Sequence, residues 1–182
     1  MADGNDNVIY SVTKAQARDS VECRWRLFQT KYCLILGSVL LVLVIARFLI
    51  YFFYDIGTWY EVYLFYPPLV VISLVSAVYY YSCYRRVIRV AEKCPVYRVT
   101  FNNVRQGSWF FRGKVYYIVS FDPGNGTIYR KTSTMFTAST YTLSPVTMEH
   151  YNNKEMYVMH DTGDDRIYVL ELADVIILSP RT

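Results

Sequence analysis

Two long apolar runs dominate the first half of the chain. Residues 33–54 include a single charge, Arg47, and residues 64–84 include none. At about 1.5 Å per residue, each run can cross a hydrocarbon core about 30 Å thick if it is helical. The pattern therefore predicts a transmembrane α-helical hairpin over residues 33–95, whose second helix extends into the cytosol as far as Pro95.

Lysine and arginine are concentrated on the outer flanks of these two runs. The connecting segment, residues 55–63, has two acidic residues and no basic one. By the positive-inside rule, we expect both termini in the cytosol and the chain in the cell (inner) membrane. The basic residues expected at the inner membrane surface are Arg24, Arg26, Lys31, Arg85, Arg86, Arg89 and Lys93.

The cytosolic N-terminal segment, residues 1–32, contains an amphipathic pattern. One helical stripe is predicted by the spacing of Val21, Trp25, Phe28 and Tyr32. A helix over residues 13–32 either lies on the inner membrane surface or forms a stem that leads into the first span. Thr13 and Gln16 have the spacing of a capping box at its start.

Small residues predict how the two spans pack. Close helix contact in a bilayer depends on small side chains, and those expected to meet are Gly37, Ser38, Ser73, Ser76 and Ala77. Arg47 allows two interpretations. Its long side chain extends outward to lipid headgroups, or it faces a partner helix or a water-filled path. The second interpretation requires an oligomer, because one hairpin cannot enclose a path.

The hydrophobic period changes from Val96 onward. Short runs rich in β-branched and aromatic residues alternate with turn sequences, for example Asp122 to Gly126. The runs predict strands over residues 96–101, 115–121, 127–132, 156–160, 166–172 and 174–178. We therefore expect a cytosolic all-β domain over residues 96–182, either a small antiparallel barrel or a sandwich.

Charge and cysteine content exclude two classes of protein. The net charge is +4, and no segment of the chain has a large excess of basic over acidic residues, whereas nucleic-acid binding needs a clustered basic face. We therefore expect no nucleic-acid polymer as a partner. A disulfide framework is not indicated by the four cysteines, which we expect to be reduced thiols: Cys23, Cys33, Cys83 and Cys94.

The candidate catalytic motifs are weak. The Asp-Thr-Gly triplet at residues 161–163 matches that of aspartic proteases, but two more aspartates follow it. This context predicts a solvated hairpin tip rather than a buried catalytic carboxylate. The two histidines, His150 and His160, lack the spacing of metal ligands. We therefore expect no metal, no cofactor and no enzymatic activity.

One group of aromatic and basic residues is a candidate ligand or partner surface. Its members are Trp109, Phe111, Arg112, Lys114, Tyr117, Arg130 and Lys131. Exposed rings would stack on a base or another ligand ring, and the cations would suit a small anionic ligand. The alternative, which we favour for the rings, is core packing, because every second residue of a strand faces the core.

Residues 113–121, 122–127, 151–161 and 168–172 form a series of strand and hairpin patterns. Together they resemble a family of bacterial two-span membrane proteins with a small β domain. Asn153 and His160 stand where glycine and tyrosine are usual in that family. The family has no established catalytic residues, so the resemblance implies none here.

The layout is also similar to the two-transmembrane β-barrel effectors of bacterial cyclic-nucleotide antiphage defence. That similarity implies a ligand-gated effector that oligomerises and disrupts or permeabilises the membrane. The residues favour another function, a non-enzymatic accessory or regulatory membrane protein whose β domain binds a protein partner. The expected partners are therefore the lipid bilayer and either another protein or further copies of the chain.

Overall fold

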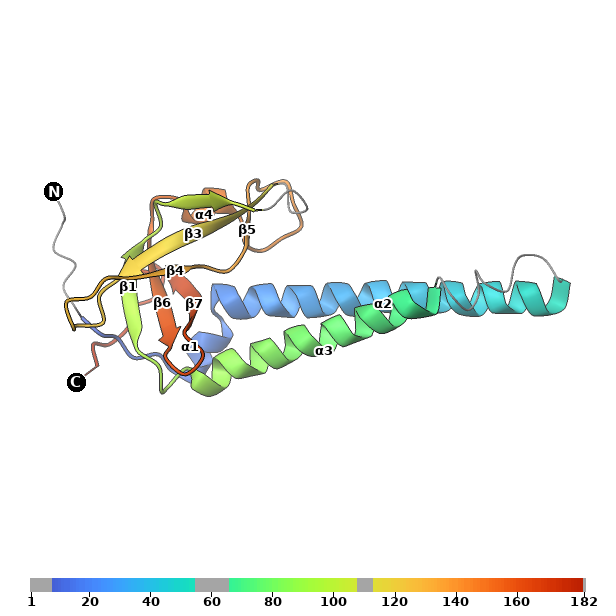
Figure 1. Cartoon of the computed structure of the whole chain (residues 1–182), viewed down its shortest axis with the longest axis horizontal. Coiled ribbons are helices and arrows are strands. Elements are labelled where there is room, and N and C mark those ends of the chain that lie inside the picture. Colours follow the sequence, from blue (N-terminus) through green and yellow to red (C-terminus); the bar gives the residue numbers. More distant parts are fainter. Residues whose placement is uncertain (1–7, 55–65, 108–112, 182) are drawn as a thin grey trace. The chain divides into compact units, whose positions relative to one another are not determined.

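The structure, a computed structural model, describes residues 8–54, 66–107 and 113–181. The chain divides into two compact units (Figure 1). We call them the β unit, Met1–Trp25 with Arg85–Thr182, and the helical unit, Arg26–Tyr84. Each long helix has one end in the β unit, and we call these ends, residues 21–25 and 85–90, the helix bases.

Two long helices, α2 (Val21–Tyr54) and α3 (Tyr66–Val90), follow the two apolar runs. Both are long and apolar enough to cross a membrane, as the sequence predicted. α3 ends shortly before Pro95, where a helix stop was expected. The connecting segment, residues 55–63, lies outside the described residues. Arg47 lies within α2, and both interpretations of its role remain predictions.

A glycine brings the two helices into contact within the helical unit. A Cβ atom added to Gly37 would lie 3.4 Å from the Cβ of Ser73, so a side chain larger than a methyl group would push the helices apart. Ser73 and Ala77 are buried, and Ser76 is half-buried. Ser38 is exposed, and its hydroxyl donates a hydrogen bond of 2.8 Å to a carbonyl of its own helix.

The stretch predicted as one helix over residues 13–32 contains a break. Helix α1 (Lys14–Arg18) begins with the expected capping box, in which the Gln16 amide donates to the Thr13 hydroxyl at 3.3 Å. The chain breaks before α2, whose first residues are buried within the β unit. Residues 21–32 therefore form a stem that leads into the first apolar run, which was one of the two predicted alternatives. Residues 8–20 pack within the β unit.

The C-terminal region forms antiparallel sheets, as predicted. One sheet has the order β1-β6-β7, with strands β1 (Val96–Thr100), β6 (Glu155–Asp161) and β7 (Arg166–Leu172). In the other sheet β3 (Lys114–Phe121) pairs with β2 (Val104–Gln106), β4 (Tyr129–Thr132) and β5 (Phe136–Thr137). Over the described residues neither sheet closes into a barrel, so the barrel alternative is not the architecture found.

The core of the β unit lies where β1 packs on β3. Phe101, directly after β1, stacks on Tyr117 with the ring centroids 4.6 Å apart. Tyr97 stacks on Phe121 at the same distance. Every second residue of β3 is buried, as its alternating sequence predicts. β6 and β7 are buried at nearly every position, because buried residues of α1 and of the helix bases also pack in this unit.

One predicted strand is wrong, and three short elements were missed. Residues 174–178 form no strand, because the chain turns after β7 and the Val175 and Ile176 amides donate to the Leu172 carbonyl at 3.1 and 3.2 Å. The missed elements are β2, β5 and helix α4 (Met148–Tyr151). Each is too short to give a periodic hydrophobic signal.

Candidate functional site

The candidate site comprises the two helix bases and the β6–β7 hairpin. Ser20 is fully buried and separates α1 from α2. Its hydroxyl donates to the Ala17 carbonyl at 2.6 Å and accepts a hydrogen bond from the Cys23 amide at 3.2 Å. A serine that accepts from an amide of the first turn caps the helix N-terminus. The cap fixes where α2 begins and places Arg24 on its first turn.

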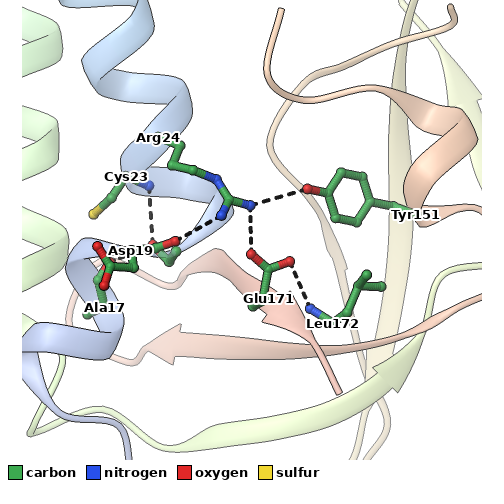
Figure 2. A network of polar contacts seen from close by, with 8 residues as sticks. Ala17, Asp19, Cys23, Arg24, Tyr151, Glu171 and Leu172 are labelled. Atoms are coloured by element: carbon green, nitrogen blue, oxygen red, sulfur yellow. Dashed lines mark hydrogen bonds and ion pairs between the residues drawn. The ribbon is translucent and has the colours of Figure 1, made fainter. Parts of the chain in front are cut away.

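Arg24 extends from α2 to the end of β7 (Figure 2). Its Nη2 atom lies 2.6 Å from Oε2 of Glu171 and 3.4 Å from the Tyr151 hydroxyl. Its Nη1 atom donates to the Asp19 carbonyl at 3.2 Å. The other carboxylate oxygen of Glu171 accepts from the Leu172 amide at 3.1 Å. The Glu171 side chain is only 7% exposed, so these charge-assisted hydrogen bonds replace its lost hydration.

The electrostatic environment keeps Arg24 charged. Burial lowers the pKa of Arg24, but the neighbouring Glu171 carboxylate more than offsets this effect, and the pKa is raised. Burial raises the pKa of Tyr151, and the negative charge of Glu171 raises it further. Tyr151 therefore remains a neutral hydrogen-bond partner near neutral pH.

Arg86 makes the corresponding connection from the base of α3. Its Nη2 atom lies 3.2 Å from Oδ2 of Asp161, and its Nη1 atom contacts the Asp164 carboxylate. The Asp161 side chain is 8% exposed, and its Oδ1 atom accepts from the Gly163 amide at 3.1 Å. The hydrogen bond to Asp164 raises the pKa of Arg86. We call the two ion pairs, Arg24–Glu171 and Arg86–Asp161, the junction.

His160 and Asp165 connect the same hairpin to the second sheet. His160 is buried, with Nε2 lying 3.1 Å from Oδ1 of Asp165, and its ring packs edge-on against Phe121 of β3 at 5.2 Å. Lys131 of β4 contacts the same carboxylate. Hydrogen bonds from Lys131 and His160 lower the pKa of Asp165. The predicted solvated hairpin tip is therefore solvated only in part, since Asp165 is exposed but Asp161 is buried.

The metal-ligating residue types are dispersed. Over the described residues, no group of three or more His, Cys, Asp or Glu side chains could hold a metal ion. His160 is instead the partner of Asp165. In the structure the four cysteines, which all lie in the described part of the chain, form no disulfide, and Cys23 and Cys94 are buried.

The described members of the predicted ligand surface do not meet at one site. Tyr117 is fully buried in the core, in agreement with the core-packing interpretation. Lys131 lies opposite a β3 residue five positions from Lys114, which corresponds to about 17 Å along a strand. Arg130 is exposed beside it. The remaining members lie outside the described residues: Trp109, Phe111 and Arg112.

The predicted membrane-surface cations separate into two groups. Arg24 and Arg86 form ion pairs inside the β unit, and Arg26 hydrogen-bonds to Gln29 at 3.4 Å. The exposed cations are Lys31, Arg85, Arg89 and Lys93. Sequence reasoning missed the partner carboxylates because Arg24 and Glu171 are 147 residues apart. The only signal was the concentration of acidic residues between Asp161 and Glu171.

Comparison of the chain with protein-family models, with curated proteins and with solved structures found no match. The resemblance to bacterial two-span proteins therefore remains a prediction.

Proposed function

We propose that this chain is a non-enzymatic membrane accessory protein, with two membrane-spanning helices and a cytosolic β unit that docks a protein partner. The observation that carries this proposal is the junction. One β-hairpin holds an arginine from each helix base through a carboxylate that is almost fully buried. A partner bound to the β unit would therefore act on both helices together.

The segment after β7 is the surface proposed for the partner. Val175 and Ile177 are 63% and 91% exposed, although both are bulky apolar residues. They follow directly on the strand that holds Glu171. Exposed apolar patches on otherwise well-packed domains commonly mark protein-binding sites, and this one adjoins the junction in sequence.

A photo-crosslinking side chain at position 177 tests the docking surface in native membranes. We expect a discrete adduct with one protein from Ile177, and none from Asn125, which is an exposed control in the β3–β4 turn. Equal adducts at both positions, or none at either, would contradict a specific docking surface after β7.

A ligand-gated effector is the second candidate, and two observations favour it. Arg47 is a charge within an apolar helix, and the junction ties the β6–β7 hairpin to the bases of both helices within the β unit. Light scattering on the detergent-solubilised chain, with and without cyclic nucleotides, separates the two functions. An accessory protein keeps one mass throughout, whereas a nucleotide-induced shift to large assemblies would establish the effector and make Arg47→Gln the next variant.

A further inference from the structure

The loop between β5 and α4, residues 138–147, presents two bulky apolar side chains at its tip. Tyr141 is 98% exposed and Leu143 is 93% exposed. Single exposed apolar residues are normal on protein surfaces. Two at alternate positions of one loop, each almost fully exposed, form a small apolar contact surface.

Hydrogen bonds hold the backbone of this loop in place. The Thr140 amide donates to the Glu149 carboxylate at 2.8 Å. The Thr142 hydroxyl donates to the Thr137 hydroxyl at 3.1 Å. These contacts lie on either side of Tyr141 and support the loop from within. The apolar side chains are therefore displayed by an ordered loop.

The chemistry of the loop suits the boundary between lipid and water. Residues 138–147 contain no charged residue, and half of them are serine or threonine. No ionised side chain of residues 138–147 themselves would have to be dehydrated on contact with a bilayer, and the nearby Glu149 carboxylate is bonded to the Thr140 amide at the start of the loop. Tyrosine is enriched at membrane interfaces, because its ring is apolar and its hydroxyl remains hydrated. Leu143 adds an aliphatic group that gains from burial among acyl chains.

Strand pairing places the start of this loop beside the base of α2. The Ala138 amide donates to the Gly113 carbonyl at 2.9 Å, and Thr137 pairs with Lys114. The Lys114 ammonium lies 6.0 Å from the ring centroid of Trp25, on the base of α2. The uncharged run of α2 begins at residue 33, eight residues after Trp25 in the sequence.

We propose that the loop of residues 138–147 inserts Tyr141 and Leu143 into the lipid–water interface of the membrane that α2 enters. This inference rests on the proposed function, since it requires α2 and α3 to span. The loop gives the β unit a direct contact with lipid, in addition to its covalent connection to both helices. A protein partner at this loop is the competing outcome.

Photolabelling from lipid tests the proposal on the full chain. The chain is reconstituted in vesicles of phosphatidylcholine and phosphatidylglycerol, with some phosphatidylcholine carrying a diazirine near the carboxyl end of its acyl chain. Trypsin then releases the loop within the peptide Thr132–Lys154, and it releases the exposed control residue Ile128 within Val115–Arg130. We expect the label in the first peptide, at Tyr141 or Leu143, and not in the second.

The variant Tyr141→Asp with Leu143→Asp should lower labelling of its peptide roughly tenfold, because a charged loop partitions poorly into the interface. The control Ile128→Asp should leave labelling unchanged. The peptide Tyr32–Arg47 of α2 reports on the spans themselves. Label in that peptide but not in the loop would overturn this proposal and leave the proposed function standing. An unlabelled Tyr32–Arg47 peptide would overturn the proposed function as well.

Discussion

Glu171 is a carboxylate that lies on a β-strand and is almost entirely withdrawn from water. Its charge is stable there because Arg24, on an element 147 residues away, supplies a short ion pair. Arg24 itself is 44% exposed and retains part of its hydration. Removing the two partners should therefore cost different amounts of stability. Loss of the arginine leaves a buried negative charge without a cation, whereas loss of the carboxylate leaves an arginine that water can still reach.

The variant Arg24→Ala should destabilise the β unit by about 1–3 kcal/mol, because Glu171 would remain buried without its cation. The free energy of unfolding, measured by denaturant titration of the detergent-solubilised chain, checks this value. The matched control is Lys14→Ala, whose ion pair with Glu92 is 57% and 53% exposed. The control should cost about 0–1 kcal/mol. Equal losses for the two variants would show that the Arg24 pair is an ordinary surface contact.

Tyr117 predicts a response to alkaline pH. Burial raises its pKa to about 12, above the ordinary value of about 10. The folded chain thus holds the phenolic proton more tightly than the unfolded chain. The stabilisation is complete below about pH 10, and above it stability falls by up to about 1.4 kcal/mol per pH unit until the folded chain itself titrates.

The variant Tyr117→Phe has no phenolic proton to lose at this position. Its stability should therefore fall less steeply than that of the native chain between about pH 10 and 12. Denaturant titrations across that range provide the measurement. The variant also loses a hydrogen bond of 3.2 Å to the Met148 carbonyl, and it should therefore be less stable at neutral pH. Parallel curves for the two chains would contradict the assignment to Tyr117.

For single residues, the sequence predicted whether a side chain is buried better than it predicted which residue that side chain contacts. The alternation along β3 indicated core packing for Tyr117, and the ring is indeed fully buried. The sequence predicts Arg24 and Arg86 at the inner membrane surface because they flank the apolar runs. Their carboxylate partners lie 147 and 75 residues away, and only the tertiary fold brings such distant residues together.

The β6–β7 hairpin is the element that joins the sheets and helices of the β unit. Its carboxylates contact Arg24 of α2, Arg86 of α3 and Lys131 of β4. Its turn contains Asp165 in a left-handed conformation with φ of 52°, a conformation that aspartate tolerates better than most residues. The hairpin should therefore be among the better protected parts of the unit.

The variant Arg86→Gln should loosen this hairpin locally, because Asp161 would lose its cation at a nearly buried position. Amide hydrogen exchange should become faster in residues 161–167 and in the last turn of α3. Arg89→Gln, an exposed cation on the same helix, is the control and should leave exchange unchanged. Identical exchange in both variants would mean that Arg86 does not secure the hairpin.

The predictability of the strands depended on their length and burial. β3, β6 and β7 have seven or eight residues and were located nearly correctly from their apolar runs. β2 has three residues, all exposed, and β5 has two, so neither carries a hydrophobic period. Residues 174–178 have a strand-like composition, but the amides of Val175 and Ile176 donate to the Leu172 carbonyl. These local hydrogen bonds form a turn, so the segment is not a strand in spite of its composition.

At the scale of the whole molecule, the two long apolar helices were the most predictable feature. Length and composition alone indicated them, and α2 and α3 follow the predicted runs closely. The division into units was less predictable. Residues 8–25 belong to the β unit rather than to a separate N-terminal segment, and α2 begins inside this unit, where Ser20 caps it and Val21 and Cys23 are fully buried.

The proposed function requires α2 and α3 to span a membrane and the β unit to lie in the cytosol. Single cysteines at Gly57, between the two apolar runs, and at Asn125, in an exposed turn of the β unit, test it with a membrane-impermeant maleimide. The native chain with its four cysteines serves as the blank. We predict that Gly57→Cys is labelled in intact cells and that Asn125→Cys is labelled only after permeabilisation. Labelling of Asn125→Cys in intact cells, or protection of Gly57→Cys there, would contradict the account.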